Sequence, residues 1–175
     1  MRAAAPVAQT STTAVHDASN WRTTLTGTTN EYFTAQQWGL AAGRNWEGAE
    51  ESAGKAVCVI GETVRKNLFA GAGSPVGSDL RIGKVSCEVI GVLKSKGQGG
   101  FQDQDDVVIA PIRMVQRRFT GNRDISAITV AVDDRYDTQV VQGTISQLLR
   151  ERRNITAGKE DNFNILDTRQ ISETL

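Results

Sequence analysis

The stretch KAVCVIGETVRKNLF, residues 55–69, contains two different apolar patterns side by side. Residues 56–60 form a continuous apolar run that ends in Gly61, which is typical of a central strand buried on both faces. After it, Val64 and Leu68 stand four positions apart with Phe69 beside them, which is the spacing of one helix face. A buried strand that passes directly into a helix predicts a fold of mixed α and β structure.

The segments after this stretch continue to alternate between strands and helices. Residues 79–94 are predicted to be two strands folded over a turn at Gly83-Lys84, with Cys87 on the core-facing side of the second strand. The remaining predicted elements are a strand at 107–112, a short basic helix at 112–119, an alternating strand at 125–134, an amphipathic helix at 137–153, a strand at 161–167 and the start of a helix at 168–175.

The segments before residue 55 are predicted to be mostly strands and loops. They comprise a short strand at 3–9, a half-buried strand at 19–28, a helical turn capped by Asn30, a strand at 38–44 and a polar loop at 45–54. We expect the three tryptophans to pack in the core or at its rim rather than to line a ligand cage; they are Trp21, Trp38 and Trp46.

The composition limits the classes of protein to consider. The 175 residues suffice for one domain or two small subdomains. Lys plus Arg and Asp plus Glu both number 20, and a net charge of zero argues against a nucleic-acid partner. No apolar run approaches the roughly 20 residues of a transmembrane helix, and residues 1–14 lack the apolar part of a signal peptide. If the protein is exported, we expect its signal or membrane anchor to lie outside this chain.

The two cysteines, Cys58 and Cys87, leave two interpretations open. With one histidine in the chain they do not make a zinc site. They are either buried reduced thiols or a single bridge between neighbouring strands, and our interpretation favours the thiols.

The segment GQGGFQDQDDVVIAP, residues 97–111, could in principle be a site for chemistry. It lacks the GK[ST] of a phosphate-binding loop, its glycines lead into a strand rather than a helix, and its spacing does not match an EF-hand. A looser calcium site on Asp103 and Asp105 stays open. We expect the three acids of this polar loop to be ionised and solvated, and His16 to lie in a surface turn, so we expect no catalytic residue and no cofactor.

Several motifs together resemble one family. The segments AGRNW, GKAVCVIGETVRKNLF, SPVGSDLRIGKVSCEVIGVLKSKGQGGFQDQDDVVIAPIRMVQRR and ISAITVAV are similar in order and spacing to the periplasmic core domain of MacB-type, FtsX-like ABC transporter permeases. The resemblance implies an α+β fold in which a small mixed α/β subdomain, here residues 10–120, is inserted into a porter-like split βαβ subdomain, here 1–9 and 121–175. It also implies that the first strand and helix of the porter-like part precede residue 3, so that the chain resembles a fragment whose exposed edge favours self-association.

The resemblance implies a non-enzymatic periplasmic domain, tethered to the inner membrane by transmembrane helices outside this chain. Such a domain would transmit ATP-driven motion and dock a periplasmic adaptor protein, and through it an outer-membrane channel of the TolC type. A second copy of the permease would be a further partner. The alternatives are a domain that binds its ligand directly, in a ligand- or peptide-sensing or a lipoprotein-releasing permease. Our candidate partner-binding residues lie in the glycine-rich loop: Gln98, Phe101, Gln102, Asp103 and Asp105.

Overall fold

The computed structural model of the chain describes residues 3–70, 74–96, 98–99, 102–121, 125, 127–131 and 138–152. Its contacts divide the chain into one unit of residues 3–131 and another of residues 1–2 with 132–175. In the second unit the structure describes α5 (Thr138–Arg152), which confirms the predicted helix. The predicted strand at 161–167 and the terminal helix lie outside the described residues.

The predicted subdomains, 1–9 with 121–175 and 10–120, stay a prediction beside this division by contacts. Strand β1 (Ala3–His16) runs without a break through residue 9, where the first boundary was expected, so the predicted strand at 3–9 exists but is longer. Strand β10 (Ala127–Ala131) pairs with residues 3–7 of β1, and both segments were expected in the porter-like part. The mixed α/β character of the fold is as predicted.

Six strands of the first unit close into a ring. The sheet order is β10–β1–β2–β9–β4–β6–β3, and β5 pairs with both β1 and β6. The ring therefore runs β1–β2–β9–β4–β6–β5, while β3 and β10 lie outside it. The bounds not given so far are β2 (Ser19–Thr28), β3 (Leu40–Gly43), β4 (Val57–Ile60), β5 (Asp79–Ile82), β6 (Val85–Leu93) and β9 (Val107–Pro111).

Strand β4 is buried on both faces, as its continuous apolar run predicts. Cys58 and Ile60 belong to one core cluster, which also contains residues of β5, β6 and β9 and the apolar face of α3 (Glu62–Phe69). Val57 and Val59 belong to a second cluster on the other face, together with the buried aromatic residues Phe33, Trp38 and Trp46. Trp21 packs against the first cluster, so all three tryptophans lie in the core or at its rim, as expected.

The helices of the first unit are short. They are α1 (Glu31–Ala35), α2 (Gly48–Ala53), α3, α4 (Ile112–Val115) and the π-helical turn η1 (Gln116–Thr120). The prediction of a polar loop at 45–54 was wrong, because Glu47 and Glu50 form a capping box that begins α2. Asn30 precedes α1 as predicted, but its side chain does not cap that helix; its amide donates to the carbonyl oxygen of Trp46 at 2.9 Å.

The β5–β6 hairpin matches its prediction closely. Gly83 lies at the turn with φ of 58°, a left-handed conformation that glycine adopts without strain. Ser86 and Glu88 are exposed, whereas Cys87 faces the core and is 1% exposed. Cys58 is also fully buried, and both residues are free thiols in this structure.

Candidate functional site

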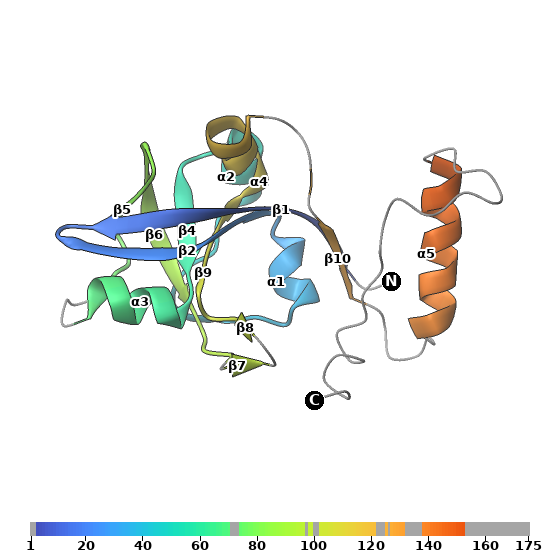
Figure 1. The fold of residues 1–175 in the computed structure, drawn as a ribbon, viewed down its shortest axis with the longest axis horizontal. Coiled ribbons are helices and arrows are strands. Elements are labelled where there is room, and N and C mark those ends of the chain that lie inside the picture. The colour runs from blue at the N-terminus through green and yellow to red at the C-terminus, as the bar shows by residue number, and fades with distance from the viewer. Residues whose placement is uncertain are drawn as a thin grey trace. The chain divides into compact units, whose positions relative to one another are not determined.

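The candidate partner-binding loop forms a small hairpin rather than an irregular connector. Strands β7 (Gln98–Gly99) and β8 (Gln102–Asp103) pair in antiparallel fashion, with Gln98 opposite Asp103 and Gly99 opposite Gln102. Figure 1 shows this hairpin projecting from the strands of the ring. The pairing brings three of the five candidate residues together on the backbone, while Phe101 lies outside the described residues.

Asp105 closes the base of this hairpin. Its carboxylate accepts hydrogen bonds from the Ser95 hydroxyl at 2.7 Å and from the Lys96 backbone amide at 2.8 Å. Asp105 is 4% exposed, so the expectation that all acids of the loop are solvated was wrong for this residue. A carboxylate satisfied inside the protein is not available to a partner's surface, and its two bonds tie the start of the hairpin to its end. The same bonds disfavour the calcium site that the sequence left open.

Asp106 fastens the loop to the sheet. Its Oδ1 atom accepts hydrogen bonds from Trp21 Nε1 at 2.9 Å and from the Thr23 hydroxyl at 2.7 Å, both on β2. Sequence reasoning did not assign this role. The only signal was an Asp-Asp pair directly before an apolar strand, which shows that two acids are present but not where their side chains point.

Lys96 lies just before β7 and fixes the start of the hairpin. Its Nζ atom donates to the carbonyl oxygen of Gln36 at 2.9 Å and lies 4.7 Å from the centre of the Trp38 ring. Burial lowers the pKa of Lys96, and the charge of Asp105 partly opposes that shift. The hairpin therefore has a base fixed by partly buried polar contacts on both sides.

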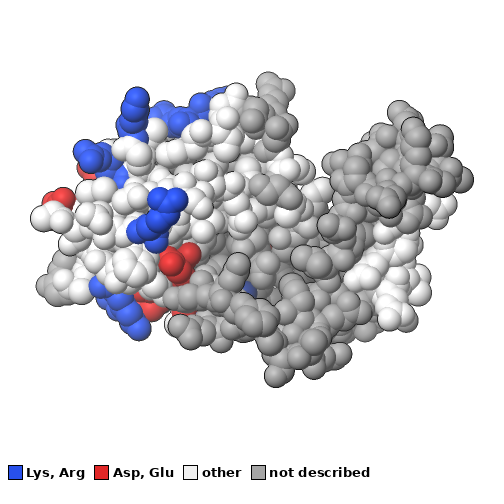
Figure 2. All heavy atoms as spheres, in the orientation of Figure 1, with Lys and Arg blue, Asp and Glu red and all other residues white. Residues whose placement is uncertain are grey.

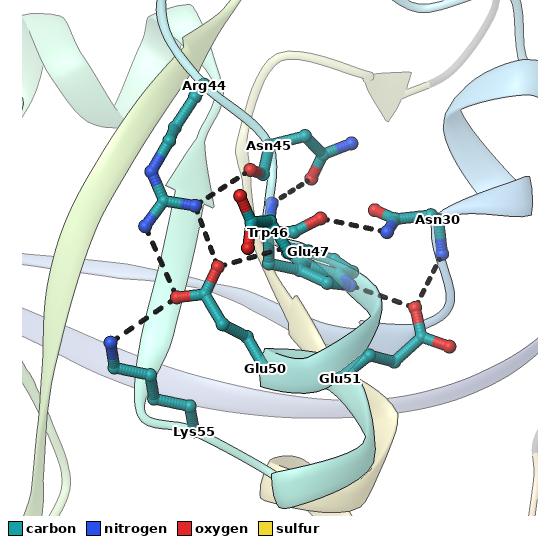
Figure 3. Close-up of polar contacts among 8 residues, drawn as sticks. All are labelled: Asn30, Arg44, Asn45, Trp46, Glu47, Glu50, Glu51 and Lys55. Atoms are coloured by element: carbon teal, nitrogen blue, oxygen red, sulfur yellow. Dashed lines mark hydrogen bonds and ion pairs between the residues drawn. The ribbon is translucent and has the colours of Figure 1, made fainter.

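A second polar cluster surrounds the start of α2 (Figure 3). The guanidinium of Arg44 donates to both carboxylate oxygens of Glu50, at 2.7 and 3.2 Å, and Lys55 lies 3.4 Å from the same carboxylate. The backbone amide of Glu47 also donates to Glu50. The hydrogen bonds from Arg44, followed by that from Glu47, lower the pKa of Glu50 to about 2.

Glu51 joins this cluster to α1. Its Oε2 atom accepts hydrogen bonds from Trp46 Nε1 and from the Asn30 backbone amide, both at 3.0 Å. The Trp46 ring, 2% exposed, packs edge-on against Phe33 with ring centres 5.3 Å apart. These carboxylates bind neighbouring protein groups, which is the arrangement of a structural cluster. Among the residues that the structure describes, no three His, Cys, Asp or Glu side chains gather as metal ligands would.

The surface near the β1–β2 turn offers an open depression of about 460 Å³. It is lined by Val15, His16, Asp17, Ser78, Asp79, Arg81 and Ser86. Small-molecule sites are usually enclosed and mostly apolar, so this open and largely polar surface does not favour direct ligand binding. On the face shown in Figure 2, Lys and Arg side chains form separate groups with Asp and Glu side chains among them. None of the described helices is long and apolar enough to span a membrane.

The chain matches a family described as the MacB-like periplasmic core domain over residues 1–148. It is 38% identical over 155 residues to a macrolide export ATP-binding/permease protein MacB of Rhodospirillum rubrum, covering 88% of this chain and 23% of that protein. A pyoverdine export ATP-binding/permease protein PvdT of Pseudomonas entomophila is 33% identical over 137 residues, covering 77% of this chain and 20% of that protein. The chain thus spans about a quarter or less of the length of these relatives.

Two solved structures share the fold. The periplasmic region of MacB from Actinobacillus actinomycetemcomitans matches with a TM-score of 0.80 at 24% identity, covering 98% of this chain and 74% of that one. The extracellular domain of the noncanonic ABC-type transporter YknZ from Gram-positive bacteria matches with a TM-score of 0.72 at 23% identity, covering 88% and 77% of the two chains.

Proposed function

The chain belongs to the family of MacB-like periplasmic core domains of ABC transporter permeases, and from this premise we propose that it transmits ATP-driven motion across the membrane to a periplasmic adaptor protein. The relatives are named as export proteins with ATP-binding and permease parts. In this proposal ATP is hydrolysed by a separate cytoplasmic domain or subunit. The described domain itself is not an enzyme and moves as a body when the transmembrane helices move.

The observation that carries the proposal is the closed ring of six strands with close-packed apolar side chains on both faces of β4. Packed protein interiors have low compressibility and pass on displacement and strain instead of absorbing them. In a ring each strand is hydrogen-bonded to two neighbours, so a force applied at one strand reaches all the others. A domain of this construction is suited to act as a lever.

The hairpin β7–β8 is the part of this lever that we propose for docking. Its base is held by Asp105 and Lys96, while Gln98, Gln102 and Asp103 lie on the two paired strands. A rigid base lowers the conformational entropy that is lost on binding, which favours affinity. We assign partner contact to Gln98, Phe101, Gln102 and Asp103, and we assign Asp105 to support of the hairpin. The adaptor would in turn contact an outer-membrane channel of the TolC type, and a second copy of the permease would complete the transporter.

The test uses the full-length transporter with Phe101→Ala and Asp103→Ala. Truncation of one true hot spot costs at least about 2 kcal/mol of binding free energy, which is roughly thirtyfold in affinity. We therefore expect adaptor affinity, measured by biolayer interferometry, to fall at least roughly thirtyfold, and export to fall with it. Gln104→Ala is the matched control, because Gln104 is an exposed residue of the same segment that is not among the candidates.

The variant Asp105→Asn distinguishes support of the hairpin from contact with the partner. Because the Asp105 carboxylate is bonded within the protein, this variant should lower thermal stability as well as adaptor binding. If Phe101→Ala and Asp103→Ala fold, bind the adaptor and export as the parent does, the hairpin is only a connector. If the purified protein binds a peptide or a lipidated protein without the adaptor, the ligand-binding alternative replaces this proposal.

A further inference from the structure

The two cysteines lie next to each other inside the ring. Cys58 on β4 and Cys87 on β6 belong to the same core cluster, and β4 and β6 are hydrogen-bonded parallel neighbours. Cys58 is opposite Val89, so Cys87 is two positions away along β6. Residues two apart on a strand point to the same face, and the two sulfur atoms are in contact at 2.7 Å.

We propose that Cys58 and Cys87 form an intramolecular disulfide bond in the native protein, cross-linking β4 to β6. The inference rests on the extracytoplasmic location that the proposed function requires, because disulfides form and persist in oxidising compartments. It does not depend on adaptor docking. The two interpretations that the sequence left open differ only in the redox state of this pair, and the contact between the sulfurs favours the bridge.

The bond needs an oxidant, and a thiol–disulfide exchange partner supplies it. One cysteine, as its thiolate, attacks a sulfur of the partner's disulfide and releases one partner thiolate. The second cysteine then attacks the mixed disulfide and releases the other. Two cysteine thiols lose two protons and two electrons, and the partner's disulfide is reduced to two thiols.

The bond has to form while the chain folds. Both thiols are at most 1% exposed in the folded protein, and burial, together with the neighbouring Cys87, raises the pKa of Cys58 well above its usual value. A buried thiol that stays protonated is a poor nucleophile and is out of reach of an exchange partner. The same burial shields a bond already formed from reductants.

The cross-link would fall at an irregular point of the ring. The register between β4 and β6 shifts between Cys58 and Val59, so the backbone ladder is interrupted directly beside the cysteines. A covalent bond at this point would join β4 to β6. In the order of the chain, α3 and β5 lie between these two strands.

The test counts thiols in the full-length transporter. Cells producing it are quenched with acid, the protein is unfolded without reductant and alkylated, and its peptides are mapped by mass spectrometry. We expect Cys58 and Cys87 to be unalkylated and joined in one linked peptide pair. Each of Cys58→Ala and Cys87→Ala should leave its remaining cysteine alkylated and remove the linked pair.

A second arm adds dithiothreitol to the medium before synthesis begins, and we expect both cysteines of that protein to be alkylated. Alkylation of both cysteines in untreated cells would overturn the proposal. So would a linked pair that joins two chains instead of one. Adaptor binding is measured on the same preparation, so a failure of the bridge and a failure of the proposed function are seen separately.

Discussion

Replacing Gly61 with alanine places a methyl group against the backbone of Asp105. Gly61 lies between β4 and α3, and its amide donates to the carbonyl oxygen of Val107 at 2.9 Å. A Cβ atom at position 61 would lie 2.1 Å from the Asp105 carbonyl oxygen, whereas ordinary contact begins near 3.4 Å. The two segments must therefore separate by about 1.3 Å, the difference between those distances.

The cost follows from what resists this separation. Forcing an extra methyl group into a packed site typically costs about 1–3 kcal/mol. The Thr63 amide donates to the same Asp105 oxygen at 3.2 Å, and losing that bond adds about 0.5–1.5 kcal/mol. We expect Gly61→Ala to lower the free energy of unfolding by about 2–4 kcal/mol, a large part of the 5–15 kcal/mol typical of a native domain.

The assay is urea unfolding followed by tryptophan fluorescence. With an m-value of about 2 kcal/mol/M, the midpoint should fall by about 1–2 M. Gly48→Ala is the matched control: it lies in the first turn of α2 with no atom within 4 Å of the added methyl group, so its midpoint should be unchanged or slightly higher. A Gly61→Ala midpoint equal to that of Gly48→Ala would refute the reasoning, since the turn would then accept the methyl group without strain.

Substitutions at two further positions test the polar contacts. Asp106→Ala leaves the Trp21 indole and the Thr23 hydroxyl without their acceptor, so it should lower the free energy of unfolding by about 1–3 kcal/mol. Asp106→Asn keeps one acceptor oxygen and should lower it less. Equal losses of the two variants in urea unfolding would contradict this account. Glu50→Gln should cost about 1 kcal/mol at pH 7, because the ion pairs of Glu50 are partly open to solvent. The folded-state pKa of Glu50 is about 2 and its ordinary value is 4.5. The difference in free energy of unfolding between the parent and Glu50→Gln is therefore fully present above about pH 4.5 and shrinks as the pH falls toward 2. A difference independent of pH between 7 and 3 would count against the role of the charge.

The sequence was most informative where apolar residues show a local period. The run in β4, the alternation in β6 and the strand β9 depend on side chains a few positions apart, so burial and face could be predicted from the pattern alone. Helix α2 was missed because no residue of that helix is buried; its only signal is the Glu47–Glu50 spacing of a capping box without the usual Ser or Thr.

The base of the candidate hairpin could not be predicted for a different reason. Asp105 bonds to Ser95 and Lys96, which lie across the hairpin, and Asp106 bonds to Trp21 and Thr23, more than 80 positions earlier in the chain. No periodic pattern reports such contacts. A charged residue is by default assigned to the surface, and its burial becomes evident only when the donors around it are located.

The ring also determines how long unpaired strand edges are exposed to other chains during folding. β1–β2 and β5–β6 are hairpins with two-residue turns, at Asp17-Ala18 and Gly83-Lys84, and hairpins of this kind form in roughly 1–10 μs. The ring closes only when β1 meets β5, which pairs Ala14 with Ile82 across 68 positions of the chain. Sheets dominated by such distant pairings fold in milliseconds to seconds. Throughout that interval the outer edges of β1 and β5 are open to strands of other chains, and the pairing of Ala14 with Ile82 is the step that joins them, whereas the outer edges of β2 and β6 are covered by β9 and β4.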